Sequence, residues 1–326
     1  MTMRPLLPVT LAAALLFVGG NLCMAVWSHR LPYYHMLEKI RTARDPNVLF
    51  VGNSLLAGLD EPALELAASQ GGVRLRSLNT ATPASQPPEH KLLFQYAARQ
   101  QPGIGTLVVG IFDFQLTVSS RYRMADVVGN RMVAVDHRFS YAEVVSAYNF
   151  GLMDRVELEM DRTLPMLANR ANAWKYVELL RRSMSSMGMP RAATNSMGRV
   201  DDFKALESMS PDTFDAEALT FLQHPDHFNP SYQYIFDQAG RAGMNIVIVV
   251  MPISPYHRAV FYSRLRWKEY LAAMDKLSNQ RHIQVIDASG WLPAAADFKD
   301  HVHMTNQAIH VFSQRLGSEL AQMDGQ

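Results

Sequence analysis

Five short segments that resemble strands alternate with helical segments along this chain, and this alternation constrains the fold more than any other feature. These strand-like runs cover residues 48–52, 73–78, 106–111, 245–250 and 282–286. The first is rich in β-branched residues, and the third is apolar throughout, as a strand covered on both faces is. Strands that alternate with helices pair in parallel through right-handed crossovers. The sequence therefore predicts an α/β fold, a three-layer α/β/α sandwich with a five-stranded parallel sheet.

The segments between these runs show helical periodicity, with glycine or proline near their ends. The expected helices cover residues 61–69, 90–99, 230–242, 264–278 and 306–323. The pattern lapses after the third strand, where 141–189 is mostly helical with a break at Pro165, and 195–226 is polar and irregular. We interpret residues 117–226 as a helical insertion into one domain rather than as a second domain.

An uncharged apolar run near the start of the chain indicates where in the cell the protein lies. Residues 6–27 contain no charged side chain, and about twenty apolar residues at ~1.5 Å each cross the core of a bilayer. A cleaved signal peptide is the alternative, but its apolar core is usually shorter and is followed by a small-residue cleavage site. The prediction is a single-pass anchor over residues 1–30 in the cytoplasmic (inner) membrane, with residues 31–326 on the extracytoplasmic, periplasmic side.

Charge and cysteine content narrow the range of partners. The 31 basic and 30 acidic residues give a net charge of +1, which argues against nucleic acid as a partner. With 48% hydrophobic and 19% charged residues, the chain can bury a large core. The single cysteine, Cys23, lies inside the apolar run, so the rest of the chain has no thiol to oxidise, which suits an oxidising compartment.

Ser54 is the first candidate for chemistry. It follows Val51 by three residues, at the carboxyl end of the first expected strand, where open parallel sheets carry their working residues. A serine on a turn that leads into a helix exposes its hydroxyl and has its backbone N–H near a helix start. A nucleophile and an oxyanion donor need these two features. On its own, Gly52-Asn53-Ser54 is also the pattern of an ordinary turn with a helix cap.

Asp300 and His303 form the second candidate group, just before the last expected helix. An aspartate three residues before a histidine can accept the imidazole N–H and so fix the tautomer and orientation of the ring. The other ring nitrogen is then free to take a proton from a serine hydroxyl. His301 competes for this role but lacks the three-residue offset. A loop in which Asp300 and Thr305 cap the helix is the alternative interpretation.

In this order, the two ends of the chain resemble the SGNH (GDSL-like) hydrolase superfamily. Its first block is a Gly-Asp/Asn-Ser turn after strand one, here Gly52 to Ser54, and its last is Asp-x-x-His before the terminal helix, here Asp300 to His303. The resemblance implies a flavodoxin-like SGNH fold, Ser54, Asp300 and His303 as catalytic residues, and no metal or cofactor.

The two middle blocks of the family are less well kept. The second block normally supplies a glycine N–H to the oxyanion hole, and here Asn79, Thr80 and Ala81 occupy its place without a glycine. The third normally reads Gly-x-Asn-Asp, and here Phe112 replaces its asparagine before Asp113. The resemblance therefore implies an oxyanion and substrate-binding group of Asn53, Asn79, Thr80, Ala81 and Asp113. Loss of one oxyanion donor lowers the rate by ~10²–10³-fold, so the replacement of this asparagine predicts slower hydrolysis.

The chain is similar to a membrane-anchored subgroup of this superfamily in three features. These are the apolar anchor, the departure in the third block, and Met-Pro-Ile-Ser-Pro at 251–255. The subgroup includes the alginate O-acetylation proteins and the D-alanine transfer protein of teichoic acids. The resemblance covers roughly residues 47–116 and 230–320. It implies an enzyme, a serine esterase or O-acetyltransferase that adds or removes acetyl groups on a surface polysaccharide (exopolysaccharide). The implied partner is a membrane-bound O-acyltransferase.

Two alternative functions and two further groups of candidate residues remain open. A plain ester hydrolase shares the same chemistry, whereas a non-catalytic accessory protein would bind glycan or the acyltransferase. The residues at 256–258, beyond the fourth strand, are candidates for contact with a sugar or carboxylate. His224 and His227 have a spacing that suits a metal only on a helix, and Pro225 between them favours a loop.

Overall fold

The computed structural model describes residues 6–28, 32–117, 122, 131–169, 211–212, 214–216 and 228–324. The chain divides into two compact units, one of residues 1–39 and 122–194 and one of residues 40–121 and 195–326. The strands are β1 (Val48–Val51), β2 (Ser77–Asn79), β3 (Thr106–Ile111), β4 (Asn245–Val250) and β5 (Ile283–Asp287). The helices of the first half are α1 (Leu6–Ser28), α2 (Pro32–Thr42), α3 (Ser54–Ala57), α4 (Glu61–Gln70), α5 (Pro87–Gln100), η1 (Gln115–Thr117), α6 (Arg131–Val135), α7 (Tyr141–Tyr148), α8 (Leu152–Thr163) and α9 (Pro165–Ala168). Those of the second half are α13 (Pro230–Arg241), α14 (Pro255–His257), the π-helical η4 (Arg258–Tyr262), α15 (Leu265–Gln280), η5 (Ala295–Asp297) and α16 (Asn306–Asp324).

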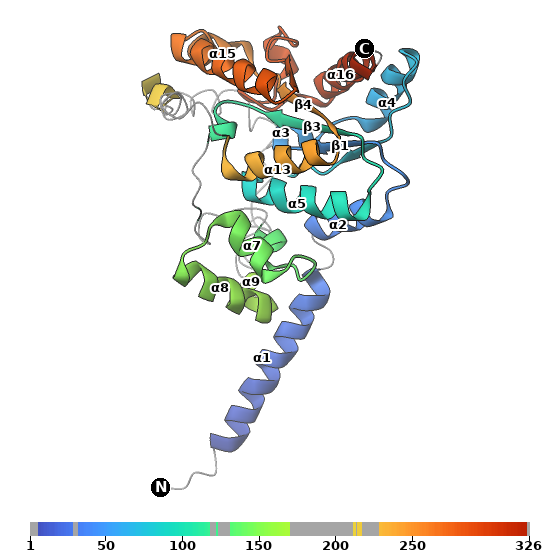
Figure 1. Cartoon of the computed structure of the whole chain (residues 1–326). Helices are drawn as coiled ribbons and strands as arrows, with labels where there is room; N and C mark the ends of the chain where they lie inside the picture. Colours follow the sequence, from blue (N-terminus) through green and yellow to red (C-terminus); the bar gives the residue numbers. More distant parts are fainter. Residues whose placement is uncertain are drawn as a thin grey trace, which may run out of the picture. The chain divides into compact units, whose positions relative to one another are not determined.

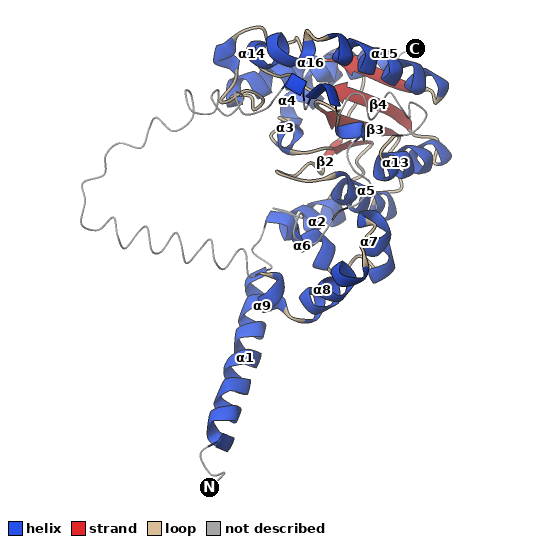
Figure 2. Ribbon diagram, turned by 90° about the vertical axis from the view of Figure 1, so that its left-hand side faces the viewer, coloured by secondary structure: helices blue, strands red, loops and turns tan. Residues whose placement is uncertain are grey.

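The second unit is built on one sheet. Its strand order is β2-β1-β3-β4-β5, and every neighbouring pair is parallel. Figure 1 shows α5 and α13 on one face of this sheet and α4, α15 and α16 on the other. The predicted three-layer sandwich with a five-stranded parallel sheet is therefore confirmed. Figure 2 shows the same strands side by side, with their ends close to α3.

The central strands are buried, which explains why their sequences lack polar alternation. All four residues of β1 are buried, and so are the last five of β3 and of β4. Strand β5 is partly exposed because it is the outer strand on its side, with β4 as its only partner. The buried strands hold the ends of β1 and β3 side by side, which brings the loops that follow them to one edge of the sheet.

Helices α4 and α16 pack against each other through a glycine. Gly317 of α16 lies directly against the backbone of Leu64 in α4, and a Cβ at this position would collide with the Leu64 carbonyl oxygen. Helix α16 therefore approaches α4 more closely than a side chain would allow. The contact ties the C-terminal helix to the helix that follows α3 in the chain.

Two of the predicted elements start three or more residues away from the position that the sequence indicated. The second strand begins at Ser77 rather than at residue 73. The side chain of Asn47 holds the preceding segment instead, because it accepts from the Arg76 N–H and donates to the Arg74 carbonyl. Helix α5 starts at residue 87, three residues earlier than expected, with a capping box between Gln86 and Glu89. Prolines at the first helical positions suit such a start because those N–H groups have no partner within the helix.

The first unit contains α1 and α6–α9. Residues 10–28 of α1 are long and apolar enough to be a membrane span or a signal sequence. Helices α6 to α9 fall within the segment predicted as an insertion, and α8 ends at Thr163, just before the break expected at Pro165. Asn21, a polar residue inside α1, accepts a hydrogen bond from the Met166 N–H of α9.

Candidate active site

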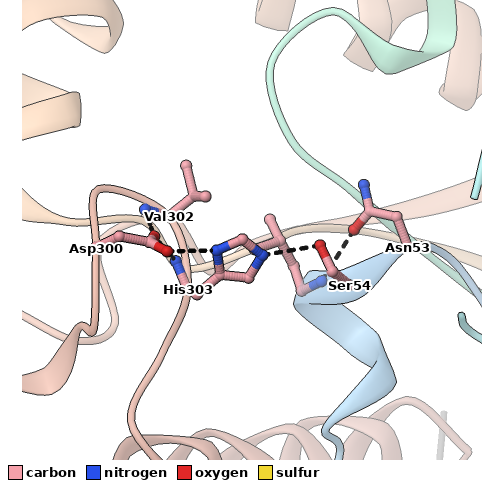
Figure 3. Close-up of polar contacts among 6 residues, drawn as sticks. Asn53, Ser54, Asp300, Val302 and His303 are labelled. Atoms are coloured by element: carbon pink, nitrogen blue, oxygen red, sulfur yellow. Dashed lines mark hydrogen bonds and ion pairs between the residues drawn. The ribbon is translucent and has the colours of Figure 1, made fainter. Parts of the chain in front are cut away.

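Ser54 is the first residue of α3, directly after the turn that ends β1. The Asn53 side chain caps this helix, since its oxygen accepts from the Leu55 N–H at 3.0 Å. Figure 3 shows the Ser54 hydroxyl pointing toward His303, which lies in the loop after β5. The turn therefore contains the helix cap that the sequence offered as an alternative interpretation of Gly52-Asn53-Ser54. Because Asn53 provides that cap, the Ser54 hydroxyl is left for another partner.

Two glycines let α3 sit directly on the strand ends. A Cβ on Gly52 would lie 3.1 Å from the Gly110 carbonyl oxygen and 3.2 Å from Leu56 Cδ2. A Cβ on Gly110 would lie 3.0 Å from the same methyl group. These distances are shorter than ordinary van der Waals contacts, so a side chain at either position would push α3 outward. The glycine of the first block therefore has a packing role that places Ser54.

Ser54, His303 and Asp300 form one chain of hydrogen bonds. The Ser54 Oγ lies 2.9 Å from His303 Nε2, and His303 Nδ1 lies 2.7 Å from Asp300 Oδ2. With the ring proton on Nδ1, facing the carboxylate, Nε2 is the acceptor for the serine hydroxyl. Figure 3 shows the three side chains in this order. The three residues come from opposite ends of the sequence and lie at the carboxyl edge of the sheet.

Asp300 is held as a carboxylate. Burial disfavours its charge, but hydrogen bonds from the His303 side chain and from the backbone N–H groups of His303 and Val302 outweigh burial and keep the pKa of Asp300 well below its usual range. Oδ1 takes both backbone bonds, at 2.7 Å from His303 N and 2.9 Å from Val302 N. The loop therefore fixes the carboxylate on one oxygen and leaves the other for the imidazole. Such an arrangement stabilises an imidazolium when the histidine takes a proton.

The backbone donors expected from the second block have other partners. The Thr80 N–H donates to the Phe50 carbonyl at 2.9 Å, which continues the β1–β2 pairing. The Ala81 N–H donates to Asn79 Oδ1 at 3.0 Å, and Asn79 Nδ2 donates to the Leu56 carbonyl. In this arrangement the oxyanion role expected for Thr80, Ala81 and the Asn79 amide is not met. Instead, Asn79 fastens the β2 loop to α3.

Asp113, expected at the oxyanion or substrate site, pairs with a buried histidine. Its carboxylate lies 3.0 Å from Nε2 of the fully buried His257, and its N–H donates to the Tyr262 hydroxyl oxygen. Asp113 adopts a φ of +47°, which aspartate tolerates better than most residues. Burial, reinforced by the Asp113 charge, raises the pKa of Tyr262 far above its usual value. The carboxylate that His257 contacts is therefore one of this chain's own.

His301 connects this pair to the triad loop. Its ring stacks on His257 with the planes 8° apart and the centroids 5.8 Å apart, and its carbonyl accepts from the Ser254 N–H. Burial, together with the neighbouring His257, lowers the pKa of His301. Position beyond a strand end pointed to His257 in the sequence, but no sequence signal indicated this stack. The stack packs the loop that carries Asp300 and His303 against the segment after β4.

A second buried chain of polar groups lies behind the nucleophile turn. His90 Nε2 lies 2.8 Å from Ser85 Oγ, and His90 Nδ1 lies 2.9 Å from the Tyr232 hydroxyl. Ser85 Oγ is in turn 3.0 Å from the Gly52 carbonyl oxygen. Burial lowers the pKa of His90 to about 3, so this imidazole is neutral at physiological pH. The chain connects α5 and α13 to the turn that carries Ser54.

The triad is open to solvent. The His303 side chain is 41% exposed and that of Asp300 22%. A cavity of ≈ 450 Å³ lies in the first unit instead, and its lining includes Ser28, Tyr33 and Arg138 but no triad residue. Among the described residues, no three or more metal-binding side chains gather into one group. His224 and His227 lie outside those residues.

Comparison with known proteins gives distant structural matches only. No family model matches the chain, and neither does any curated protein sequence. Among solved structures, a GDSL-like lipase from Bacteroides thetaiotaomicron is 9% identical, with a TM-score of 0.42, and the match covers 90% of this chain and 98% of that one. A lipase/acylhydrolase from Enterococcus faecalis is 10% identical, with a TM-score of 0.38 and coverage of 85% and 95%. These values are too low to place the chain in a family or to transfer a function.

Proposed function

We propose that this chain is a membrane-anchored serine esterase or acyltransferase of the SGNH type. The single observation that carries the proposal is the continuous hydrogen-bond chain from Ser54 through His303 to Asp300. Nucleophile, base and orienting carboxylate are each within hydrogen-bond distance of the next, which is the geometry that nucleophilic acyl transfer requires. The order of these residues in the sequence, and their place at the carboxyl edge of a parallel sheet, support the same chemistry.

The proposed reaction proceeds through an acyl-serine. Ser54 Oγ attacks the ester carbonyl carbon while His303 Nε2 takes the hydroxyl proton, and Asp300 stabilises the imidazolium. The tetrahedral intermediate collapses, the C–O bond to the alcohol breaks, and His303 returns its proton to the leaving alkoxide. Water or an acceptor hydroxyl then attacks the acyl-serine by the same steps in reverse. Hydrolysis and transfer differ only in this second nucleophile.

Two donors next to the nucleophile are proposed for the oxyanion hole. The Ser54 N–H lies at the start of α3, and no acceptor for it occurs among the backbone bonds of the described residues. Because the Asn53 oxygen is held by Leu55, its NH₂ group faces away from the α3 backbone. Asn53 thereby supplies the side-chain amide that Phe112 does not supply in the third block. Oxyanion donors of this kind contribute ~10²–10³ in rate each.

The proposed substrate is an O-acetyl ester on a surface polysaccharide, with a membrane-bound O-acyltransferase as partner. Three observations support this. The first is the resemblance of the sequence to the membrane-anchored acylation proteins. The second is the apolar helix α1, which suits an enzyme held at a membrane. The third is the exposure of His303, because an open triad admits a polymer that a deep pocket would exclude.

A non-catalytic accessory protein is the second candidate. The observation that favours it is the engagement of the Thr80 and Ala81 N–H groups by other acceptors, together with Phe112 in place of an asparagine. In that case the domain binds glycan or the acyltransferase, and the triad is present but does not catalyse a reaction. Hydrolysis of a simple ester separates the two candidates.

The test uses the full-length protein in detergent with p-nitrophenyl acetate as substrate. Ser54→Ala and His303→Ala should each lower kcat by about 10³-fold or more, because each removes a member of one catalytic unit. Ser69→Ala, an exposed serine on α4, is the control and should retain full activity. Equal rates in all four proteins would refute catalysis by this triad and support the accessory role.

A further inference from the structure

Helix α8 exposes a row of large apolar side chains. Leu152 is 77% exposed, Met153 78%, Val156 50% and Met160 49%. At 3.6 residues per turn these four positions fall within an arc of about 100° on one face of the helix. Met166 of α9 is also exposed, by 37%. We call these five residues the α8–α9 apolar face.

The remaining described surface lacks a comparable row. Outside α1 and the α8–α9 apolar face, the exposed large apolar residues that the structure describes are Leu66, Tyr141, Tyr256, Leu265 and Val311. They are scattered over different elements, as single exposed apolar residues usually are. A contiguous apolar face on a short helix is different, because its exposure to water is costly unless something covers it.

The contact between α9 and α1 indicates what covers it. Met166 N donates to Asn21 Oδ1 at 3.2 Å, and Asn21 Nδ2 donates to the Phe17 carbonyl. A Cβ on Gly20 would lie 2.8 Å from Met166 Sδ, so the two helices touch where α1 has no side chain. Asn21 lies seven residues before the end of α1 at Ser28, which is about 10 Å along the helix. If α1 spans a membrane, α9 therefore reaches below the end of the span.

We propose that α8 and α9 lie in the membrane–water interface beside α1, with the α8–α9 apolar face in contact with the lipid acyl chains. The proposal rests on the proposed anchoring by α1. It accounts for a polar residue within the apolar helix, because Asn21 satisfies a backbone N–H at a depth where water is scarce. A depth of ~5–10 Å is usual for the apolar face of an interfacial helix.

The charges on α8 specify the kind of surface. Acidic residues outnumber basic ones on this helix, whose only cations are Arg155 and Arg162. The exposed Glu159 borders the apolar face on one side. Attraction to anionic lipid is therefore not the source of binding, unlike in the usual basic interfacial helix. Contact with lipid should depend on apolar burial, tolerate high salt, and be at least as strong with zwitterionic as with anionic lipids.

The test places single labels on the full-length protein in lipid vesicles. Cys23→Ala removes the native thiol, and a polarity-sensitive fluorophore is attached after Met153→Cys or Met160→Cys. Ala142→Cys, an exposed position on α7 in the same unit, and Leu66→Cys, an exposed apolar position on α4, are matched controls. In phosphatidylethanolamine vesicles, lipid-attached nitroxides should quench the 153 and 160 labels at least about two-fold more than the 142 and 66 labels.

The outcomes are distinct. Quenching at 153 and 160 no greater than at 66 overturns the proposal. A blue-shifted label that loses its shift on dilution of the protein also overturns it, because a second copy then covers the face. The same labels on a Ser54→Ala background should give the same quenching. Esterase activity, measured separately on the parent chain, can fail without affecting this result, so the two proposals are tested independently.

Discussion

At Asn53 one side chain combines two roles. Its oxygen caps α3 through the Leu55 N–H, and its NH₂ group is the amide donor that we propose for the oxyanion. A carboxylate would retain the first role and lose the second, since it accepts hydrogen bonds but donates none when ionised. The SGNH pattern that the sequence resembles allows aspartate here, but that pattern also has a third-block asparagine, and this chain has Phe112 at that place. The residue therefore offers a way to separate structure from catalysis at a single position.

Asn53→Asp should keep the helix cap and lower kcat for p-nitrophenyl acetate by about 10²-fold or more, because the amide donor is lost and a negative charge is added near the oxyanion. KM and thermal stability should change little. Asn79→Asp is the comparison, since Asn79 holds the β2 loop to α3 and should lose stability instead. Unchanged kcat in Asn53→Asp would exclude Asn53 from the oxyanion hole.

Residue types and their order along the chain were enough to indicate Ser54, Asp300 and His303, and the fold brings these three within hydrogen-bond distance. The oxyanion donors could not be predicted in the same way. Whether a backbone N–H is available depends on which acceptor faces it, and Thr80 and Ala81 have acceptors in Phe50 and Asn79. Such pairings are set by the register of β1 and β2, which the composition of the segment does not reveal.

At the scale of elements, the close packing of α4 against α16 requires a residue without a side chain at position 317. Gly317 lies against backbone atoms of Leu64, which cannot rotate away as a side chain can. By contrast, a Cβ on Gly240, near the end of α13, would meet nothing within 4 Å. The two helical glycines therefore differ only in what surrounds them.

Gly317→Ala should destabilise the protein by about 1–3 kcal/mol, because the methyl group collides with backbone that cannot rotate away. Gly240→Ala should be neutral or stabilise it by up to about 1 kcal/mol through the lower conformational entropy of the unfolded chain. Urea unfolding of the full-length protein in detergent measures both. A Gly317→Ala protein as stable as the parent would show that α16 can shift away from α4.

Strands β3 and β4 begin and end at the residues that the apolar runs predicted, because burial on both faces leaves an uninterrupted sequence signal. Strand β2 starts later than predicted. Residues 73–76 alternate between apolar and basic, as residues of a strand can, but the Asn47 side chain holds their backbone instead. The start of α5 was also missed, because two prolines there resemble a turn. Local composition thus predicted elements well only where no side chain competes for the backbone.

At the scale of the whole molecule, the buried Ser85–His90–Tyr232 chain makes stability depend on pH. His90 has a pKa of about 3 in the folded protein against an ordinary value of 6.5. Between these values the unfolded chain binds a proton that the folded protein does not. The free energy of unfolding therefore falls as pH drops below about 6.5, by up to about 1.4 kcal/mol per pH unit from this one group.

Replacement of His90 by glutamine should remove this component. The His90→Gln protein should lose less stability than the parent between pH 7 and pH 5 (by roughly 2 kcal/mol at most), whatever its stability at pH 7. Unfolding free energies of both proteins at several pH values measure the difference. Parallel curves would mean that His90 takes up a proton in the folded state as readily as in the unfolded one.

The distance in sequence between Ser54 and His303 is 249 residues, and β5, one of the two outer strands, precedes the loop that carries His303. A growing chain therefore contains Ser54 long before it contains His303. The proposed catalytic site is therefore complete only once β5 and the loop after it have joined the sheet. Since β5 has a single neighbouring strand, detachment of this edge would separate base from nucleophile while most of the sheet stays intact.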